Sequence, residues 1–167
     1  AIVEEGEELN LCVVGGAQTT KDVARVMGIE VSGEQHEKLV AVVFCQGDDE
    51  AAKFPGVYKG IEDCAAAIYS QDVSKRCKYG CVGMGSCVKS CPFDAIHLSE
   101  GGIPYVDAEK CTACGNCVRA CPRDLIELHP VSHNSFVYCK SQDPGPIARK
   151  VCKKACIACK ACVKAAA

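Results

Sequence analysis

The apolar positions of this chain form short runs, which predict short helices and strands. Leu39–Phe44 is an unbroken apolar run rich in β-branched residues, and it predicts a buried strand that ends at Cys45. Upstream, apolar residues at helical spacing predict a helix over Lys21–Met27 that ends before Gly28. Gly60–Tyr69 has the pattern of a turn that leads into a second short helix.

The middle of the chain contains an internal repeat. The segment Cys87–Leu98 recurs as Cys117–Leu128, with Cys, Pro, Asp, Ile and Leu at the same places and an offset of thirty residues. A duplicated unit of this size predicts two half-domains related by pseudo-symmetry. After the Cys-Pro of each copy comes a short alternating run with a second apolar run downstream, so two strand pairs are predicted. These pairs are Ala95–Leu98 with Ile103–Val106, and Leu125–Leu128 with Val137–Cys139.

The amino-acid composition indicates that the fold is stabilised by something besides apolar burial. The 167 residues include 16 Cys but no Trp, and aromatic residues make up 5%. A core so poor in aromatic residues and so rich in Cys needs metal or disulfides. The net charge of −2 gives nucleic-acid binding no electrostatic support, and no apolar run approaches the roughly 20 residues of a membrane span.

The cysteine spacing indicates iron–sulfur chemistry. The run Cys111-x2-Cys114-x2-Cys117-x3-Cys121-Pro has the bacterial ferredoxin spacing for [4Fe–4S] clusters. Three thiolates in a loop curl over three corners of a cubane, while the fourth points away to the other cluster of the pair. Zinc favours two separate Cys-x2-Cys pairs, and disulfides need an oxidising compartment, so both alternatives fit less well.

The first half of the repeat is irregular, because Met84 stands where the middle ligand should be. Cys77 is the nearest cysteine in sequence, and we expect it to replace the missing thiol. Crossed ligation then gives two predicted groups. One group is Cys77, Cys81, Cys87 and Cys121, and the other is Cys91, Cys111, Cys114 and Cys117.

Two further groups of cysteines remain. A third motif near the end of the chain offers three ligands and has Ala166 where a trailing Cys would stand; its thiols are Cys156, Cys159 and Cys162. Four other thiols are enough for one additional cluster, and their alternative interpretation is as ordinary buried thiols. These are Cys45, Cys64, Cys139 and Cys152, of which Cys152 occupies the position equivalent to Cys77.

The predicted fold class is α+β, with a bacterial 2×[4Fe–4S] ferredoxin-like module at its centre. Residues 1–75 form a lead-in region that contains Cys, residues 76–129 form the ferredoxin-like domain, and residues 130–167 begin a second ferredoxin-like module. The chemistry expected of this arrangement is one-electron transfer, and no residue pattern indicates bond-making catalysis.

The order of these motifs along nearly the whole chain resembles the B subunit of the Rnf complex, in its long, clostridial-type form. The segments that carry the resemblance are Cys12-Val-Val-Gly15-Gly16, Val42-Val-Phe-Cys45-Gln-Gly47, Gly60-Ile-Glu-Asp-Cys64, Cys77-Lys-Tyr-Gly-Cys81-Val-Gly-Met-Gly-Ser-Cys87, the two ferredoxin half-motifs and Cys152-Lys-Lys-Ala-Cys156-Ile-Ala-Cys159.

This resemblance implies a function and a location. It implies an electron-relay component of a ferredoxin:NAD⁺ oxidoreductase coupled to Na⁺ or H⁺ translocation, with soluble ferredoxin as donor and the other Rnf subunits as partners. It also implies a peripheral position on the cytoplasmic face of the cell membrane, through an N-terminal helix that precedes this chain. Cys12 matches the last ligand of an N-terminal cluster in that family, and we expect it to be unligated here because its partner cysteines are missing.

Other functions stay open on the sequence alone. The chain also fits a soluble ferredoxin-type carrier, an iron–sulfur module of a soluble oxidoreductase, or a zinc-binding interaction module. Basic residues from Val137 onward form either a solvated face or a positive region beside a negative cofactor or an acidic partner such as ferredoxin. Individual cations along the chain are expected to offset cluster charge or to lie on a solvated face: Lys78, Lys89, Arg119 and Lys153.

Overall fold

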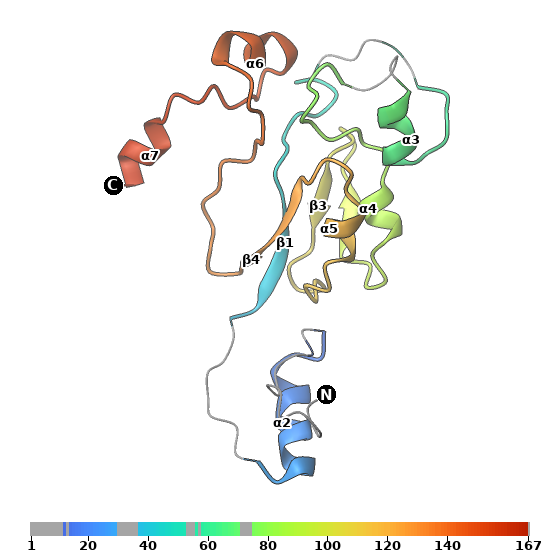
Figure 1. Ribbon diagram of the computed structural model, residues 1–167, viewed down its shortest axis with the longest axis vertical. Helices are drawn as coiled ribbons and strands as arrows, with labels where there is room; N and C mark the ends of the chain where they lie inside the picture. Colours follow the sequence, from blue (N-terminus) through green and yellow to red (C-terminus); the bar gives the residue numbers. More distant parts are fainter. Residues whose placement is uncertain are drawn as a thin grey trace.

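The computed structural model describes residue 12 and residues 14–29, 37–52, 56, 58–70 and 75–166. Short helices and short strands alternate along the described residues, in agreement with the predicted α+β class (Figure 1). The elements are α2 (Gly16–Met27), β1 (Leu39–Val43), α3 (Cys64–Tyr69), α4 (Ser86–Lys89), β2 (Ile96–Leu98), β3 (Pro104–Val106), α5 (Asn116–Ala120), β4 (Ile126–Pro130), α6 (Gly145–Val151) and α7 (Ala161–Ala166).

The strand β1 pairs with β4, and this corrects one prediction from the sequence. The two strands are antiparallel, with Val43 opposite Ile126 and Leu39 opposite Pro130. The sequence predicted Val137–Cys139 as the partner of β4. β4 pairs with the longer apolar run of β1 because this pairing buries Ala41 and Ile126 in one core cluster.

The two helices of the repeat, α4 and α5, pack beside these strands. Each follows a cysteine loop and begins just after a glycine with positive φ, Gly85 at 72° and Gly115 at 75°. The predicted hairpin is confirmed, since β2 and β3 are antiparallel with Ile96 opposite Val106. Its buried Ile96 joins the same core cluster as the β1–β4 pair.

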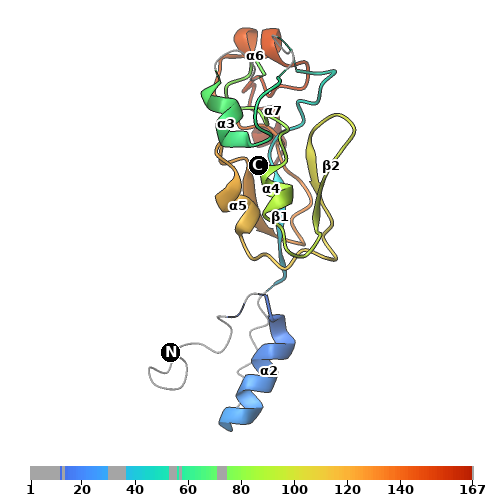
Figure 2. The ribbon, with the colours of Figure 1, turned by 90° about the vertical axis from the view of Figure 1, so that its right-hand side faces the viewer.

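The helix α2 lies at one end of the molecule, beyond the end of β1 (Figure 2). Its predicted end is confirmed, since Gly28 adopts φ 66° and its N–H donates to the carbonyls of Ala24 and Arg25. Within the described residues no helix has both the length and the apolar character needed to cross a membrane.

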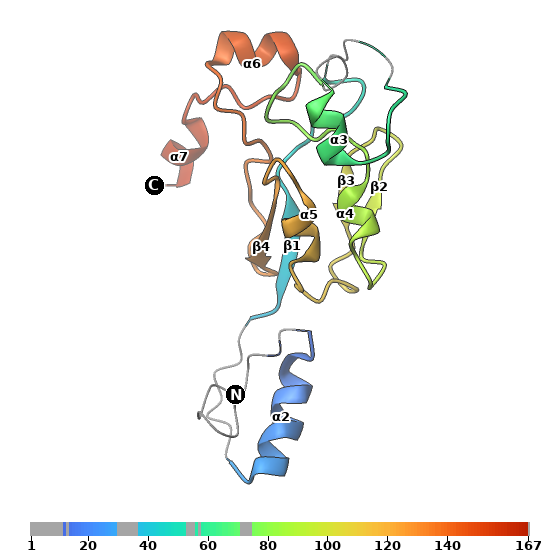
Figure 3. The same ribbon diagram turned by 45° about the vertical axis from the view of Figure 1, so that its right-hand side comes forward.

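The opposite end of the molecule carries α3 and α6 (Figure 3). The chain returns here from β4, and Cys152 forms an isolated antiparallel bridge with Ala52. The N–H of Lys153 donates to the carbonyl of Ala51 at 2.8 Å. These contacts attach the C-terminal segment to the residues that follow β1, which brings distant cysteines together.

Candidate iron–sulfur sites

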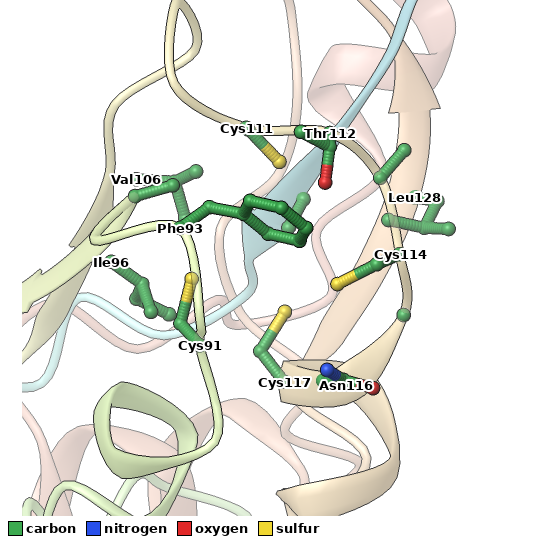
Figure 4. Close-up of a pocket in the computed structure, with 14 residues that line it drawn as sticks. Cys91, Phe93, Ile96, Val106, Cys111, Thr112, Cys114, Asn116, Cys117 and Leu128 are labelled. Carbon is green, nitrogen blue, oxygen red and sulfur yellow. The ribbon is translucent and has the colours of Figure 1, made fainter. Parts of the chain in front are cut away.

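One group of four thiols lies around a cavity beside β1, called pocket A here. In Figure 4 the four sulfur atoms point into one space, and the ring of Phe93 lies across that space in the same view. The loop before α5 supplies two of the thiols, the first turn of α5 supplies a third, and the turn after α4 supplies the fourth. They belong to Cys91, Cys111, Cys114 and Cys117, which is the grouping that crossed ligation predicts.

A second cavity, pocket B, is lined by residues of α3, α4 and α5 and corrects the sequence-based grouping. Cys64 lines it in the place that was predicted for Cys77. Nearness in sequence was misleading, because α3 reaches pocket B from the lead-in region while Cys77 faces another cavity. The four thiols of pocket B are Cys64, Cys81, Cys87 and Cys121.

Local hydrogen bonds explain how Cys64 reaches this position. Asp63 caps α3 by accepting from the N–H of Ala66 at 2.9 Å. Its other carboxylate oxygen accepts from the hydroxyl of Ser86 at 3.0 Å, and that hydroxyl accepts from the N–H of Cys64 at 2.8 Å. Ser86 is the first residue of α4, so the network fixes the start of α3 against the start of α4. Cys64 thereby supplies the fourth thiol of pocket B, in place of the cysteine that is absent at position 84.

A third cavity, pocket C, contains four of the five cysteines that remain before the terminal motif; the fifth is Cys12. Cys45 is the second residue after β1 and forms an isolated antiparallel bridge with Cys139. A Cβ atom on Gly47 would lie 3.3 Å from the sulfur of Cys152 and 3.8 Å from that of Cys45, so the backbone passes close to both thiols. The sequence predicted Cys64 in this set, and the structure has Cys77 instead. The thiols of pocket C are Cys45, Cys77, Cys139 and Cys152.

The three pockets follow one another along β1 and the two residues after it. Ala41 lines pocket A, Val43 lines pocket B, and Phe44 with Cys45 lines pocket C. Pockets B and C adjoin directly, because the N–H of Cys81 lies 3.3 Å from the sulfur of Cys45. Strand β1 and the two residues after it therefore form part of the walls of all three sites.

The cysteine loops share one backbone shape, with two left-handed residues separated by a single residue. The left-handed pairs are Gly83 and Gly85, Ala113 and Gly115, and Ala158 and Lys160. The residue between them is Met84, Cys114 or Cys159. The terminal loop thus has the shape of the two ferredoxin loops, although Cys156 is half-buried and Cys159 and Cys162 are exposed. Cys12 is also exposed.

Burial shapes the acid–base behaviour of the thiols. Loss of solvent raises the pKa of Cys81 to about 11 and that of Cys87 to about 12. Burial likewise raises the pKa values of Cys77, Cys117 and Cys152. Metal ligation requires thiolates, so iron binding at these sites has to displace protons.

The donor sets fit [4Fe–4S] clusters better than single ions. No three His, Cys, Asp or Glu side chains within the described ranges are arranged to hold one metal ion. Each pocket instead offers four thiols around an empty space that is partly open to solvent. Its volume is about 340 Å³ in pocket A, 360 Å³ in pocket B and 380 Å³ in pocket C. Four cysteine thiolates are the usual donor set of this cluster. All sixteen cysteines lie in the described part of the chain and are free of disulfides.

Sequence reasoning missed two cations at these pockets. Arg123 lines pocket B and donates to the carbonyls of Cys77 and Gly80, at 2.8 and 2.7 Å. Lys75 lines pocket C and is only 3% exposed. The sequence repeat could have identified Arg123, because Arg123 occupies the position that Phe93 has in the other copy.

The cations that the sequence singled out have other partners. Lys78 pairs with Asp143 at 3.4 Å, and Lys89 donates to the carbonyl of Glu62 at 2.5 Å. Arg119 bonds the side chain of Asn116, and Lys153 is exposed. Asp94 and Asp124 each lie two residues after the proline of a Cys-Pro pair, and each has a left-handed φ of 50°.

The loop of pocket B gives a prediction about Gly83. Its φ is 79°, and a Cβ there would lie 2.9 Å from the carbonyl oxygen of Gly102. We expect Gly83→Ala to cost about 1–3 kcal/mol and to lower the thermal midpoint of the cluster-loaded chain. Gly56→Ala is the matched control, because a Cβ at Gly56 meets no atom within 4 Å. Equal midpoints for the two variants would contradict this account of the loop.

The comparisons with known proteins agree with the cysteine geometry. Residues 76–125 match the family described as 4Fe-4S dicluster domain. The B subunit of the ion-translocating oxidoreductase complex of Methanosarcina acetivorans is 43% identical over 98% of this chain and 61% of its own length. The B subunit of the Na⁺-translocating ferredoxin:NAD⁺ oxidoreductase complex of Acetobacterium woodii is 47% identical, over 93% of this chain and 46% of that protein.

A third relative gives the same result. The B subunit of the proton-translocating ferredoxin:NAD⁺ oxidoreductase complex of Clostridium ljungdahlii is 42% identical over 93% of this chain and 54% of its own length. The chain thus spans between 46% and 61% of the length of these three proteins. Identity of 42–47% over nearly the whole chain, together with the dicluster domain at its centre, shows that this stretch of chain is similar to the B subunits of Rnf-type ion-translocating oxidoreductase complexes.

Proposed function

We propose that this chain relays electrons through three [4Fe–4S] clusters, one in each of pockets A, B and C. It does so as part of a ferredoxin:NAD⁺ oxidoreductase complex that couples electron transfer to Na⁺ or H⁺ translocation. The observation that carries the proposal is the succession of three four-thiol pockets along β1 and the residues that follow it. A row of neighbouring redox centres suits a relay, whereas a simple two-cluster carrier has no use for pocket C.

The protein's part in this chemistry is to hold and tune the clusters. Clusters bound in the pockets supply one-electron redox chemistry. The thiols fix the iron atoms, and backbone amides in the cysteine loops direct hydrogen bonds at sulfur, as the N–H of Leu125 does toward Cys121 at 3.4 Å. The terminal thiols of Cys156, Cys159 and Cys162 are proposed as ligands of a further cluster whose remaining ligand is supplied from elsewhere.

Iron and acid-labile sulfide per chain, measured after anaerobic reconstitution, test this proposal. Three filled pockets give roughly twelve of each, since one cluster holds four irons. A value of roughly eight would limit the relay to the ferredoxin pair and remove pocket C from it. Bound zinc without sulfide would overturn the proposal altogether.

The C-terminal segment is proposed as the docking surface for an acidic electron donor, reduced ferredoxin. Six cationic side chains are exposed there: Arg149, Lys150, Lys153, Lys154, Lys160 and Lys164. This assembly is proposed to work on the cytoplasmic face of the cell membrane, with the other components of the complex as partners.

Docking by charge predicts a steep salt dependence. We expect the rate of reduction of the loaded chain by ferredoxin to fall on the order of tenfold when salt rises from about 0.01 to 0.2 M. Stopped-flow absorbance measures this rate. Lys150→Glu should slow reduction at low salt, while the control Lys21→Glu, on the distant helix α2, should not. A reduction rate that changes neither with salt nor in Lys150→Glu would rule out docking at this segment.

A further inference from the structure

The three pockets differ in the positive charge on their walls. None of the residues that line pocket A is charged. Arg123 is the cation lining pocket B. Pocket C is lined by three lysines, Lys75, Lys140 and Lys154, and by no carboxylate among the described residues. Positive charge therefore increases in the same order as the pockets follow one another along β1.

The difference between pockets A and B arises at one position of the repeat. Phe93 and Arg123 are equivalent residues, each two positions after the cysteine that begins the Cys-Pro pair. Phe93 lines pocket A and packs against the core, whereas Arg123 lines pocket B. The pseudo-symmetry thus gives the two ferredoxin sites matching thiols and different electrostatic surroundings.

The guanidinium of Arg123 lies between two sites. It lines pocket B, and its two hydrogen-bond acceptors are the carbonyls of Cys77 and Gly80, both of which line pocket C. Carbonyls are neutral, so these bonds hold the side chain without cancelling its charge. Burial lowers the pKa of Arg123, while negative charge on thiolates of both sites would raise it, namely Cys77 and Cys45 of pocket C and Cys81 and Cys121 of pocket B.

Pocket C contains the most deeply buried cation of the described residues. Lys140 and Lys154 form ion pairs with carboxylates, which offsets their charge. Lys75 is 3% exposed and donates to the carbonyl of Gly47. Its charge acts on Cys152 in pocket C and also on Cys81 in pocket B. A buried cation acts on its neighbours with little screening.

The cations near pocket A act more weakly. Arg119 is exposed and lies over Gly115. Lys110 is exposed too, and it pairs with Asp94 at 2.9 Å. Solvent and salt screen exposed charges strongly, so neither equals a buried or half-buried cation on a pocket wall.

We propose that this increase in positive charge sets the reduction potentials of the three clusters, lowest in pocket A, higher in pocket B and highest in pocket C. At equilibrium with a reduced low-potential ferredoxin, pocket C, which Cys152 and Lys154 of the C-terminal segment line, is then the first to be reduced, pocket B the second and pocket A the last. Each reduction adds one electron to one cluster and oxidises the donor by one electron, with no bond or proton exchanged. This inference rests on the proposed function, because it requires all three clusters.

A redox titration monitored by EPR, on the anaerobically reconstituted chain, tests the order directly. The signals of pockets A, B and C are identified as those lost in Cys111→Ala, Cys87→Ala and Cys139→Ala. In the unmodified chain the cluster of pocket A should be the hardest to reduce and that of pocket C the easiest. A lowest potential in pocket B or C would overturn the proposal.

Substitution of Arg123 tests the cause. Arg123→Gln removes the charge and keeps hydrogen-bond donors, so the reduction equilibrium of pocket B should fall on the order of tenfold, which is 59 mV for one electron. Pocket A should be unchanged, and Arg123→Lys should restore most of the potential of pocket B. The control Arg149→Gln, on the exposed end of α6, should shift none of the three.

Iron analysis of the same samples separates the outcomes. An unchanged potential for pocket B in Arg123→Gln, with full iron content, would overturn the role of this charge. If Arg123→Gln lost iron from pocket B, the proposal would still be tested by the order of potentials in the unmodified chain and by the potential of pocket B in Arg123→Lys. A chain that takes up no iron would overturn the proposed function itself, which is a different result from a wrong order of potentials.

Discussion

Replacing Cys64 with Ala is expected to abolish the magnetic interaction between the two clusters of the ferredoxin pair, because Cys64 lines pocket B with Cys81 and Cys87. Iron should fall from roughly twelve to roughly eight per chain. Cys77→Ala should lose a similar amount of iron but keep the interaction, since Cys77 lines pocket C. EPR of the fully reduced, reconstituted variants measures the interaction.

This pair of variants separates the two assignments cleanly. Grouping the cysteines by nearness in sequence predicts the reverse result, with the interaction lost in Cys77→Ala and kept in Cys64→Ala. Cys12→Ala is the control for the loss of a thiol as such, because Cys12 is exposed and lines none of the three pockets. It should match the unmodified chain in iron content and in spectrum.

Replacing Cys139 with Ala is expected to release the C-terminal segment as well as the cluster of pocket C. The four thiols of this pocket come from positions far apart in the sequence, so a cluster there ties residues 139–152 to β1 and to Cys77. Metal binding of this kind contributes directly to folding, by about 10 kcal/mol or more in small structural metal sites. Without it, the attachment depends on the Ala52–Cys152 bridge, the Lys153 bond and the Lys154–Asp48 pair.

Limited proteolysis under anaerobic conditions measures this release. Cleavage within residues 140–160 should be roughly tenfold faster in Cys139→Ala than in the unmodified chain, with the spectrum of the ferredoxin pair retained. Cys162→Ala is the matched control, because its thiol is exposed and lies outside pocket C. Equal cleavage rates in Cys139→Ala and Cys162→Ala would show that no cluster joins these segments.

The sequence predicted the repeated half-sites well, because each depends on local spacing. The cysteine loop that begins at Cys111 and the helix α5 that follows it are adjacent in the sequence, and the structure has both. The β2–β3 hairpin was predictable for the same reason. Three of the four thiols of pocket B were also assigned correctly to one place.

The errors concern groupings that depend on tertiary structure. Nothing local distinguishes Cys64 from Cys77 as the substitute for the thiol missing at Met84, since the choice depends on how Asp63 and Ser86 dock α3 against α4. In the same way, the partner of β4 is decided by which apolar run buries more surface, and β1 is the one. Arg123 was overlooked because its importance appears only when it is compared with Phe93 across the repeat.

The strand β1 has a consequence for the spacing of the redox centres. Successive residues of a strand advance by about 3.3 Å, and neighbouring strands hold them in fixed register. Ala41, Val43 and Cys45 therefore mark the three sites at regular intervals along one continuous piece of backbone. Because the rate of electron tunnelling falls exponentially with distance, this covalent spacer keeps the hops between neighbouring sites short. Thermal motion that moves one site moves its neighbours with it.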